Sequence, residues 1–156
     1  MQWQDVLADK SLQNLPYKIE LNEKGKIEMS HASVIHSLLQ GKFARLIGSQ
    51  LNNGEVFTEL AVSTRAGVRV PDVAWGSKAY VAQHIDEICA LSAPEICVEI
   101  VSASNTQTEM EEKIALYLES GAIEVWIVDE TGEISYFDGK GKRGSTQFDV
   151  LIGPLL

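Results

Sequence analysis

The alternation of apolar and polar residues is most informative at residues 94–105, which predict a short apolar strand carrying one carboxylate. Successive side chains of a strand point to opposite faces, which places Ile96, Val98 and Ile100 on one face and Cys97, Glu99 and Val101 on the other. A strand that is apolar on both faces is normally covered on both faces. An ionised Glu99 without a partner is costly in that setting, so the pattern predicts a cation near its carboxylate.

In the first third of the chain the pattern predicts a short helix and turn at residues 1–16, a β-hairpin at 17–29 and a long helix at about 32–47. In the hairpin, Gly25 supplies the positive φ that a tight turn between two alternating segments requires. In the long helix, apolar residues recur with the helical period. Ser30 is a suitable N-cap for this helix, because its side-chain oxygen can accept a hydrogen bond from the first turn.

Two alternating segments follow, at residues 55–63 and 68–75, and both are predicted to be strands. Pro71 lies within the second segment and has no N–H for a strand ladder, so it marks a strand edge or an interruption of pairing. A connection with a helical turn near residues 80–84 leads to the apolar strand. Beyond that strand the pattern predicts a helix at residues 108–120 and two strands at 124–129 and 133–137. A loop at 138–144 and a last edge strand at 148–152 follow.

Together these elements predict an α/β fold, with a mixed β-sheet flanked by helices and preceded by the N-terminal β-hairpin. The apolar strand, the helix at 108–120 and the strand at 124–129 form a crossover unit. Its two strands should be parallel and its connection right-handed. The earlier strands can pair as antiparallel neighbours. A length of 156 residues suits a single domain, with boundaries 1–156.

Composition narrows the functional classes. Apolar residues make up 45% of the chain, which is typical of a globular protein. No stretch approaches the roughly 20 apolar residues of a membrane span. The first residues lack the layout of a signal peptide, and Cys89 and Cys97 lack metal-ligand spacing, which favours a cytoplasmic protein with free thiols. The net charge of −9 argues against tight nonspecific binding to nucleic acid, although a local basic groove is compatible with an acidic exterior.

Two carboxylates, Asp72 and Glu99, stand inside otherwise apolar strands and are the main candidates for chemistry. If their strands are neighbours, both acids can converge on one divalent cation. Mg²⁺ is the best fit, because it prefers hard oxygen ligands and retains several waters. The backbone carbonyl of Ile100 could supply a third ligand. Such an ion can activate a water molecule and stabilise charge on a phosphoryl oxygen.

Lys113 is the best candidate for the cation near Glu99. It lies at the border of the buried stripe of its predicted helix, and its long side chain can reach over the end of the sheet. There it could orient an attacking water or neutralise a phosphate. Plainer interpretations stay open: Asp72 as a turn residue, Glu99 in a structural ion pair with Arg69 or Lys113, and Lys113 as an ordinary solvated lysine.

Three segments occur in a distinctive order, at residues 70–73, 94–104 and 113–129, and they are preceded by Glu28–His31. This set resembles the Uma2 family of restriction-endonuclease-like proteins, which is numerous in cyanobacteria and belongs to the PD-(D/E)XK nuclease superfamily. The resemblance covers nearly the whole chain. It implies an α-β-β-β-α-β core and a site that hydrolyses phosphodiester bonds with Mg²⁺ or Mn²⁺.

The resemblance also implies roles for individual residues. Asp72 corresponds to the aspartate of the Pro-Asp pair and Glu99 to the second acid. The superfamily pattern has a lysine two residues after that acid, where this chain has Val101, whereas the family pattern has a lysine at the position of Lys113. The match around Glu28 suggests an additional acid near the metal.

The leading hypothesis is therefore a cytoplasmic DNA endonuclease in which Asp72 and Glu99 hold the ion and Lys113 assists the attacking water. Cutting both strands would require a homodimer, because so small a domain faces one strand. The alternative is a weakly active or inactive module that binds DNA or a partner, motivated by Val101 and the acidic charge. An enzyme acting on another phosphorylated molecule ranks lower, since no glycine-rich phosphate loop is present and no organic cofactor is expected.

One basic segment remains, with Lys140, Lys142 and Arg143 in the loop predicted at residues 138–144. Such a loop is usually solvated, and the sharper hypothesis is that it contacts a nucleic-acid phosphate.

Overall fold

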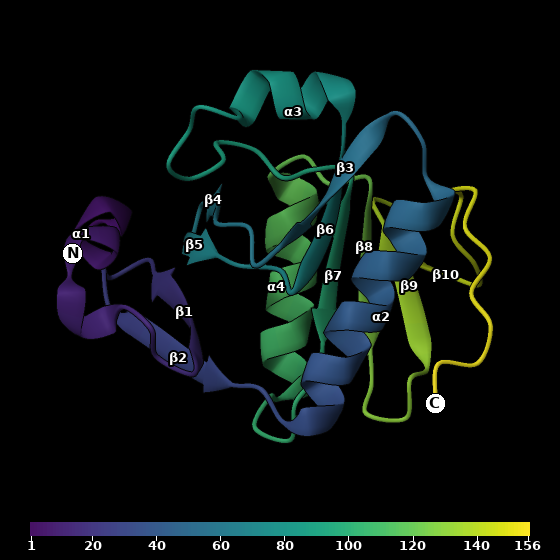
Figure 1. Ribbon diagram of the computed structural model, residues 1–156, viewed down its shortest axis with the longest axis horizontal. Coiled ribbons are helices and arrows are strands. Elements are labelled where there is room, and N and C mark those ends of the chain that lie inside the picture. Colours follow the sequence, from purple (N-terminus) through teal and green to yellow (C-terminus); the bar gives the residue numbers. More distant parts are fainter.

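A computed structural model describes residues 1–156 as two β-sheets and four helices (Figure 1). The elements are, in chain order, α1 (Trp3–Ala8), a 3₁₀ turn (Lys10–Leu12), β1 (Tyr17–Asn22), β2 (Ile27–His31), α2 (Val34–Gln50), β3 (Gly54–Thr58), β4 (Val62–Thr64), β5 (Gly67–Arg69), β6 (Val73–Ser77), α3 (Lys78–His84), β7 (Ile96–Ile100), α4 (Gln107–Glu119), β8 (Glu124–Val128), β9 (Ile134–Asp138) and β10 (Gly141–Arg143).

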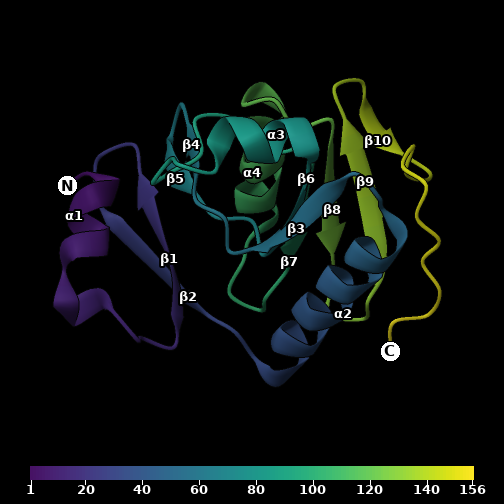
Figure 2. The ribbon, with the colours of Figure 1, turned by 45° about the horizontal axis from the view of Figure 1, so that its top comes forward.

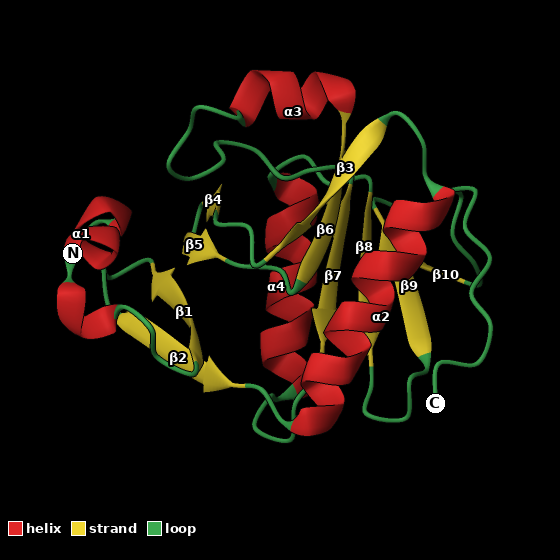
Figure 3. Ribbon diagram, in the orientation of Figure 1, coloured by secondary structure: helices red, strands yellow, loops and turns green.

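The larger sheet has six strands in the order β10-β9-β8-β7-β6-β3. Only β7 and β8 pair in parallel, and α4 makes the crossover between them, as the sequence predicts. All other neighbours are antiparallel, so the sheet is mixed. The series α2-β3-β6-β7-α4-β8 is the expected α-β-β-β-α-β core (Figure 3).

Strand β7 is buried along its whole length, because a helix covers each face of the sheet around it. Ile96, Val98 and Ile100 belong to the cluster that also contains the buried apolar residues of α2. Cys97 faces the other way and packs in a cluster with Tyr117 of α4. Fully burying one such aliphatic side chain contributes about 1.5–3 kcal/mol. The central strand therefore holds its register firmly beneath both helices.

Two strands expected to be continuous are each divided between the sheets, which corrects the prediction. Residues 55–63 separate into β3 and β4, because Glu59 adopts a positive φ of 52° between them. Residues 68–75 separate into β5 and β6 around Pro71, which cannot donate to a ladder. Between β3 and β6 the chain thus passes to the smaller sheet and back, and Asp72 lies where it returns to the larger sheet.

Three smaller expectations are also wrong. The N-cap of α2 is Ser33 rather than Ser30, since the Ser33 side chain accepts the His36 N–H. Residues 148–152 form no strand and run as coil, although Phe148 and Ile152 pack on the core. Most of the loop predicted at 138–144 is a short hairpin, with β10 paired to β9.

The smaller sheet has the order β2-β1-β5-β4 and carries the predicted hairpin, in which Gly25 has a φ of 70°. The hairpin and α1 lie beside the six-stranded sheet (Figure 2). Strand β1 of the hairpin pairs with β5 through Leu21↔Val68 and Asn22↔Gly67. Gly67 has a φ of 94°, and a Cβ there would lie 2.1 Å from the Leu21 carbonyl oxygen, so only glycine permits this approach. The junction fixes β1 against the body of the protein.

No helix in the structure is sufficiently long and apolar to cross a membrane.

Candidate active site

Asp72 is fully buried at the point where the chain passes from the smaller sheet to the larger one. Its Oδ2 atom accepts a 2.8 Å hydrogen bond from the backbone N–H of Ile100, at the end of β7. His36 of α2 approaches the same oxygen, with Nε2 at 3.3 Å. The neighbouring strand and helix therefore fix the carboxylate and leave Oδ1 for another partner.

Glu99 projects from β7 toward α4 and is also buried. Its Oε1 atom accepts a 2.6 Å hydrogen bond from the Tyr117 hydroxyl and a 3.1 Å hydrogen bond from Lys113 Nζ. The cation predicted near Glu99 is therefore present, and the Lys113 ammonium is one of the groups that provide it. Arg69, the other partner considered, instead donates to the Leu21 carbonyl.

The two acids meet at a second lysine, which the sequence interpretation missed. Lys18 of β1 places its Nζ atom 3.0 Å from Asp72 Oδ1 and 3.1 Å from Glu99 Oε2. Its side chain is only 12% exposed. One ammonium thus bridges two carboxylates that are 27 residues apart in the chain and lie on adjoining segments of the fold.

Glu20 is a third acid of the site and was likewise missed. It is buried on β1, accepts the Val70 N–H at 3.1 Å and accepts Lys113 Nζ at 2.8 Å. Glu28, the auxiliary acid suggested by the sequence, lies opposite Glu20 on β2. Its side chain is 52% exposed and it contacts neither Asp72 nor Glu99. The structure therefore brings Glu20, and not Glu28, into the buried cluster.

The charges of this cluster explain how three acids are accommodated in the interior. Two ammonium groups, from Lys18 and Lys113, lie among Glu20, Asp72 and Glu99. Burial alone would lower the pKa of Lys18, but the surrounding carboxylates, Glu99 first, raise it well above its ordinary value. The cluster retains an excess of negative charge, which is favourable for binding a further cation.

The two central acids respond differently to this environment. Burial would raise the pKa of Asp72, but Lys18, His36 and the Ile100 N–H together lower it. For Glu99, burial is the largest influence and raises its pKa in spite of the two lysines. Asp72 is therefore the more firmly ionised of the two carboxylates.

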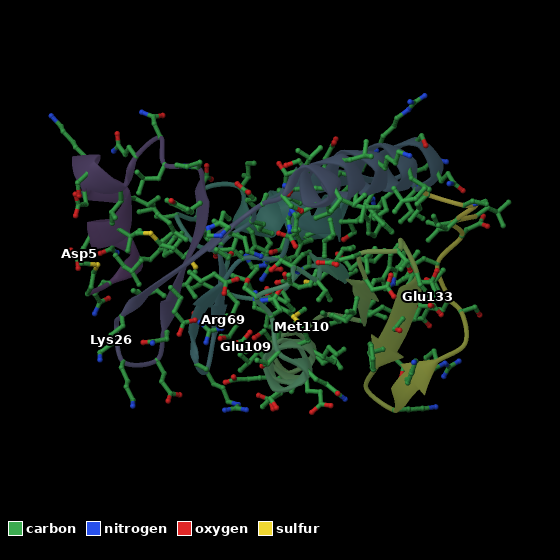
Figure 4. All side chains as sticks on the ribbon, turned by 90° about the horizontal axis from the view of Figure 1, so that it is seen from below. Asp5, Lys26, Arg69, Glu109, Met110 and Glu133 are labelled. Carbon is green, nitrogen blue, oxygen red and sulfur yellow. The ribbon has the colours of Figure 1, made fainter.

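A polar cavity of about 240 Å³ opens beside the cluster. Lys18, His36, Asp72, Glu99, Ile100, Ser102, Asn105 and Lys113 are among the residues that line it. An adjoining cavity of about 360 Å³ lies between the hairpin and α4, and Glu20, Glu28, Arg69 and Glu109 are among its lining residues. Figure 4 shows Arg69 and Glu109 between the hairpin and α4. The buried cluster thus lies beside two polar cavities that can hold small ions and polar ligands.

The basic segment lies elsewhere. Lys140, Lys142 and Arg143 are exposed on the β9–β10 hairpin, at one edge of the larger sheet. That edge is three strands away from β7, or about 14 Å at the usual spacing. Arg143 contacts Asp138 at 3.3 Å. The structure does not bring these residues to the acids.

The donor set of the cluster is suited to a small hard cation. One oxygen of Asp72 and one of Glu99 converge on a single cationic position, now held by the Lys18 ammonium. Nowhere do three or more His, Cys, Asp or Glu side chains converge as a complete metal cage. Two carboxylates with water in the remaining positions is a usual arrangement for Mg²⁺. Ile100 contributes its N–H to Asp72, which orients this carboxylate.

A weak signal for the missed residues exists in the sequence. Lys18 and Glu20 are two residues apart on β1 and therefore share a face, so a lysine and a glutamate point in the same direction from a half-buried strand. His36 and Tyr117 carry no comparable signal, because a polar atom at a buried helical position is not visible in the periodicity.

Comparisons with known proteins agree with this architecture. The Uma2 family model, described as "Putative restriction endonuclease", matches residues 3–148. A solved structure from Anabaena variabilis, described as "a putative nuclease belonging to DUF820", is similar over 99% of this chain and 90% of its own, with a TM-score of 0.70 and 22% sequence identity. At that identity the similarity shows the fold alone. The comparison with curated proteins gives no match. Because the family model spans all but the ends of the chain, the protein belongs to the Uma2 family.

Proposed function

We propose that this protein is a metal-dependent endonuclease that hydrolyses phosphodiester bonds in DNA. The observation that carries the proposal is the convergence of Asp72 Oδ1 and Glu99 Oε2 on one cationic position beside a polar cavity. The description of the family as restriction endonucleases supports the same reaction class.

In this proposal Asp72 and Glu99 hold Mg²⁺ or Mn²⁺, with the Ile100 carbonyl as a further candidate ligand. When bound, the ion supplies an activated water and stabilises negative charge on the phosphoryl oxygens. The Ile100 N–H and the Tyr117 hydroxyl keep the two carboxylates in position, through hydrogen bonds of 2.8 and 2.6 Å. Such supporting contacts commonly determine both metal affinity and ligand orientation.

Lys113 is the residue proposed to assist the reaction directly. Its ammonium lies on the cavity wall, 3.1 Å from Glu99 Oε1 and 2.8 Å from Glu20 Oε1. From there it can orient the attacking water or neutralise the scissile phosphate as charge develops. Glu20 holds this ammonium beside the site.

DNA is the proposed substrate and a homodimer the proposed working form, because one site of this size reaches one strand of a duplex. The basic β9–β10 hairpin, with Lys140, Lys142 and Arg143, could contact the backbone at a distance from the acids. Sedimentation with and without duplex DNA tests the dimer, and a chain that stays monomeric while cutting both strands would contradict it.

The decisive experiment combines metal binding with plasmid nicking. Calorimetry with Mn²⁺ should detect binding to the wild type and lose it in D72N and E99Q, while supercoiled plasmid is nicked by the wild type alone. E55Q, which changes an exposed acid on β3 at the opposite end of the sheet from Ile100, is the matched control and should behave as wild type. Undiminished nicking by D72N would exclude the proposed site. DNA binding without nicking would instead favour a binding module of the same fold.

A further inference from the structure

We propose that Lys18 is the resident counter-ion of the metal position, so that its ammonium neutralises Asp72 and Glu99 in the metal-free protein and must leave before a divalent ion binds. This inference rests on the proposed function, because it concerns the same pair of acids. In this exchange the divalent ion takes the place of the Lys18 ammonium between the two acids.

The geometry of Lys18 distinguishes it from an ordinary neighbouring lysine. Its Nζ atom makes two short contacts, one to each acid, and these use Asp72 Oδ1 and Glu99 Oε2. The other oxygens of both acids are already engaged, by the Ile100 N–H and by Tyr117 and Lys113. A metal ligated by both acids would therefore need the same two oxygens that Lys18 holds.

An ammonium and a divalent ion cannot share that position. Mg²⁺ sits about 2.0–2.1 Å from its oxygen ligands, closer than the 3.0 and 3.1 Å that separate Lys18 Nζ from the two acids. Two like charges within a few ångströms also repel strongly where little water screens them. Binding of the ion therefore expels the ammonium from the bridge.

The structure provides somewhere for the displaced ammonium to go. Lys18 lines the 240 Å³ cavity, and its flexible side chain emerges from a hairpin strand at the side of the site. Once free, the ammonium would remain at the cavity and add positive charge where a phosphate approaches. Glu20, 3.8 Å from Lys18 Nζ on the same strand, is a carboxylate to which it can move.

Lys113 provides the matched comparison. It touches Glu99 at Oε1 and Glu20, and it makes no contact with Asp72. Removing Lys113 lowers the positive charge of the site by the same amount as removing Lys18, but it does not vacate the bridging position. Lys26, exposed on the same hairpin, controls for net charge alone.

The test is calorimetric titration of Mn²⁺ into chelator-treated wild type, K18M, K113M and K26M at one pH and ionic strength. K18M should bind Mn²⁺ at least about tenfold more tightly than wild type, because a like charge at contact distance has been removed. K113M should gain less, and K26M should match wild type. In EDTA, K18M should melt below the wild type, and Mn²⁺ should raise its melting temperature more than that of the wild type.

The outcomes separate this inference from the proposed function. If wild type binds Mn²⁺ through Asp72 while K18M binds it no more tightly, the exchange is refuted and the metal site stands. If neither protein binds the ion, the metal site and the exchange both fall. Binding by K18M alone supports the exchange, with the wild type held in its metal-free form. If K18M does not fold without metal, K18Q, which keeps a polar side chain, carries the same comparison.

Discussion

The hydroxyl of Tyr117 donates a 2.6 Å hydrogen bond to Glu99 Oε1, and this contact ties helix α4 to the central strand β7. Both side chains are buried, so water offers neither a replacement partner. Burial is the largest influence on the Tyr117 hydroxyl and, with the adjacent Glu99, raises its pKa well above the ordinary value, which keeps the hydroxyl protonated as a donor.

Replacing Tyr117 with phenylalanine should therefore destabilise the protein by about 2 kcal/mol, because a hydrogen bond to a charged group is lost in the interior. Metal affinity should fall as well, since Glu99 loses the contact that orients it. Chemical denaturation and Mn²⁺ calorimetry measure the two effects. Y136F is the matched control, because Tyr136 is only partly buried and packs edge-on against Trp126. Equal stability of the two variants would contradict the structural role of the hydroxyl.

Asp72 and Glu99 should have opposite effects on the pH dependence of stability in the metal-free protein. The pKa of Asp72 is lowered from an ordinary 3.8, so its stabilising contribution is present above that pH and is lost as the pH falls through the folded-state value. The pKa of Glu99 is raised from 4.5, so its contribution is most favourable below that pH and declines as the pH rises through the folded-state value.

At pH 7, D72N should therefore lower the free energy of unfolding by about 3 kcal/mol, because it leaves Lys18 without a main partner. E99Q should lower it by less. The difference between D72N and wild type should narrow as the pH drops below 3.8. Denaturation of chelator-treated protein at a series of pH values measures both trends. A larger loss for E99Q than for D72N at pH 7 would show that the ionisation order of the two acids is reversed.

The junction between β1 and β5 predicts a strong effect at Gly67. An alanine there would have to keep a φ of 94° and would place its Cβ 2.1 Å from the Leu21 carbonyl. G67A should therefore destabilise the protein by about 1–3 kcal/mol and loosen the strand that carries Lys18 and Glu20. Hydrogen exchange should show faster exchange in the hairpin. G139A, at a glycine with open space around it, is the control and should have little effect.

Glu124 predicts a defect at the other end of the molecule. It is buried on β8 and accepts hydrogen bonds from Trp126 Nε1, Thr146 Oγ1 and the Gln147 N–H, at 2.7, 2.6 and 2.7 Å. In E124Q an amide NH₂ replaces one of the accepting oxygens and faces these donors, which should lower the free energy of unfolding by about 1–3 kcal/mol. Residues 144–156 should then be cleaved faster by protease, while Mn²⁺ binding is unchanged. Protease resistance equal to that of wild type would show that Glu124 does not anchor this segment.

The sequence alone determined the local elements and their order. The helical period of α2 and α4, the turn at Gly25 and the apolar run of β7 are set by short-range geometry and by solvent exclusion, and both leave a pattern along the chain. The parallel pairing of β7 and β8 followed as well, because two strands of one sheet that are joined through a helix normally run parallel. The two central acids were identifiable because a carboxylate inside an apolar segment needs a partner.

The tertiary structure decided which groups meet. Lys18 lies 54 residues before Asp72 and 81 before Glu99, and no local pattern connects residues at such distances. The division of two expected strands between two sheets depends on long-range pairing, and it is this division that sets Asp72 beside β7. Periodicity records which face of an element is buried, whereas the partner across that face is chosen by the packing of the whole chain.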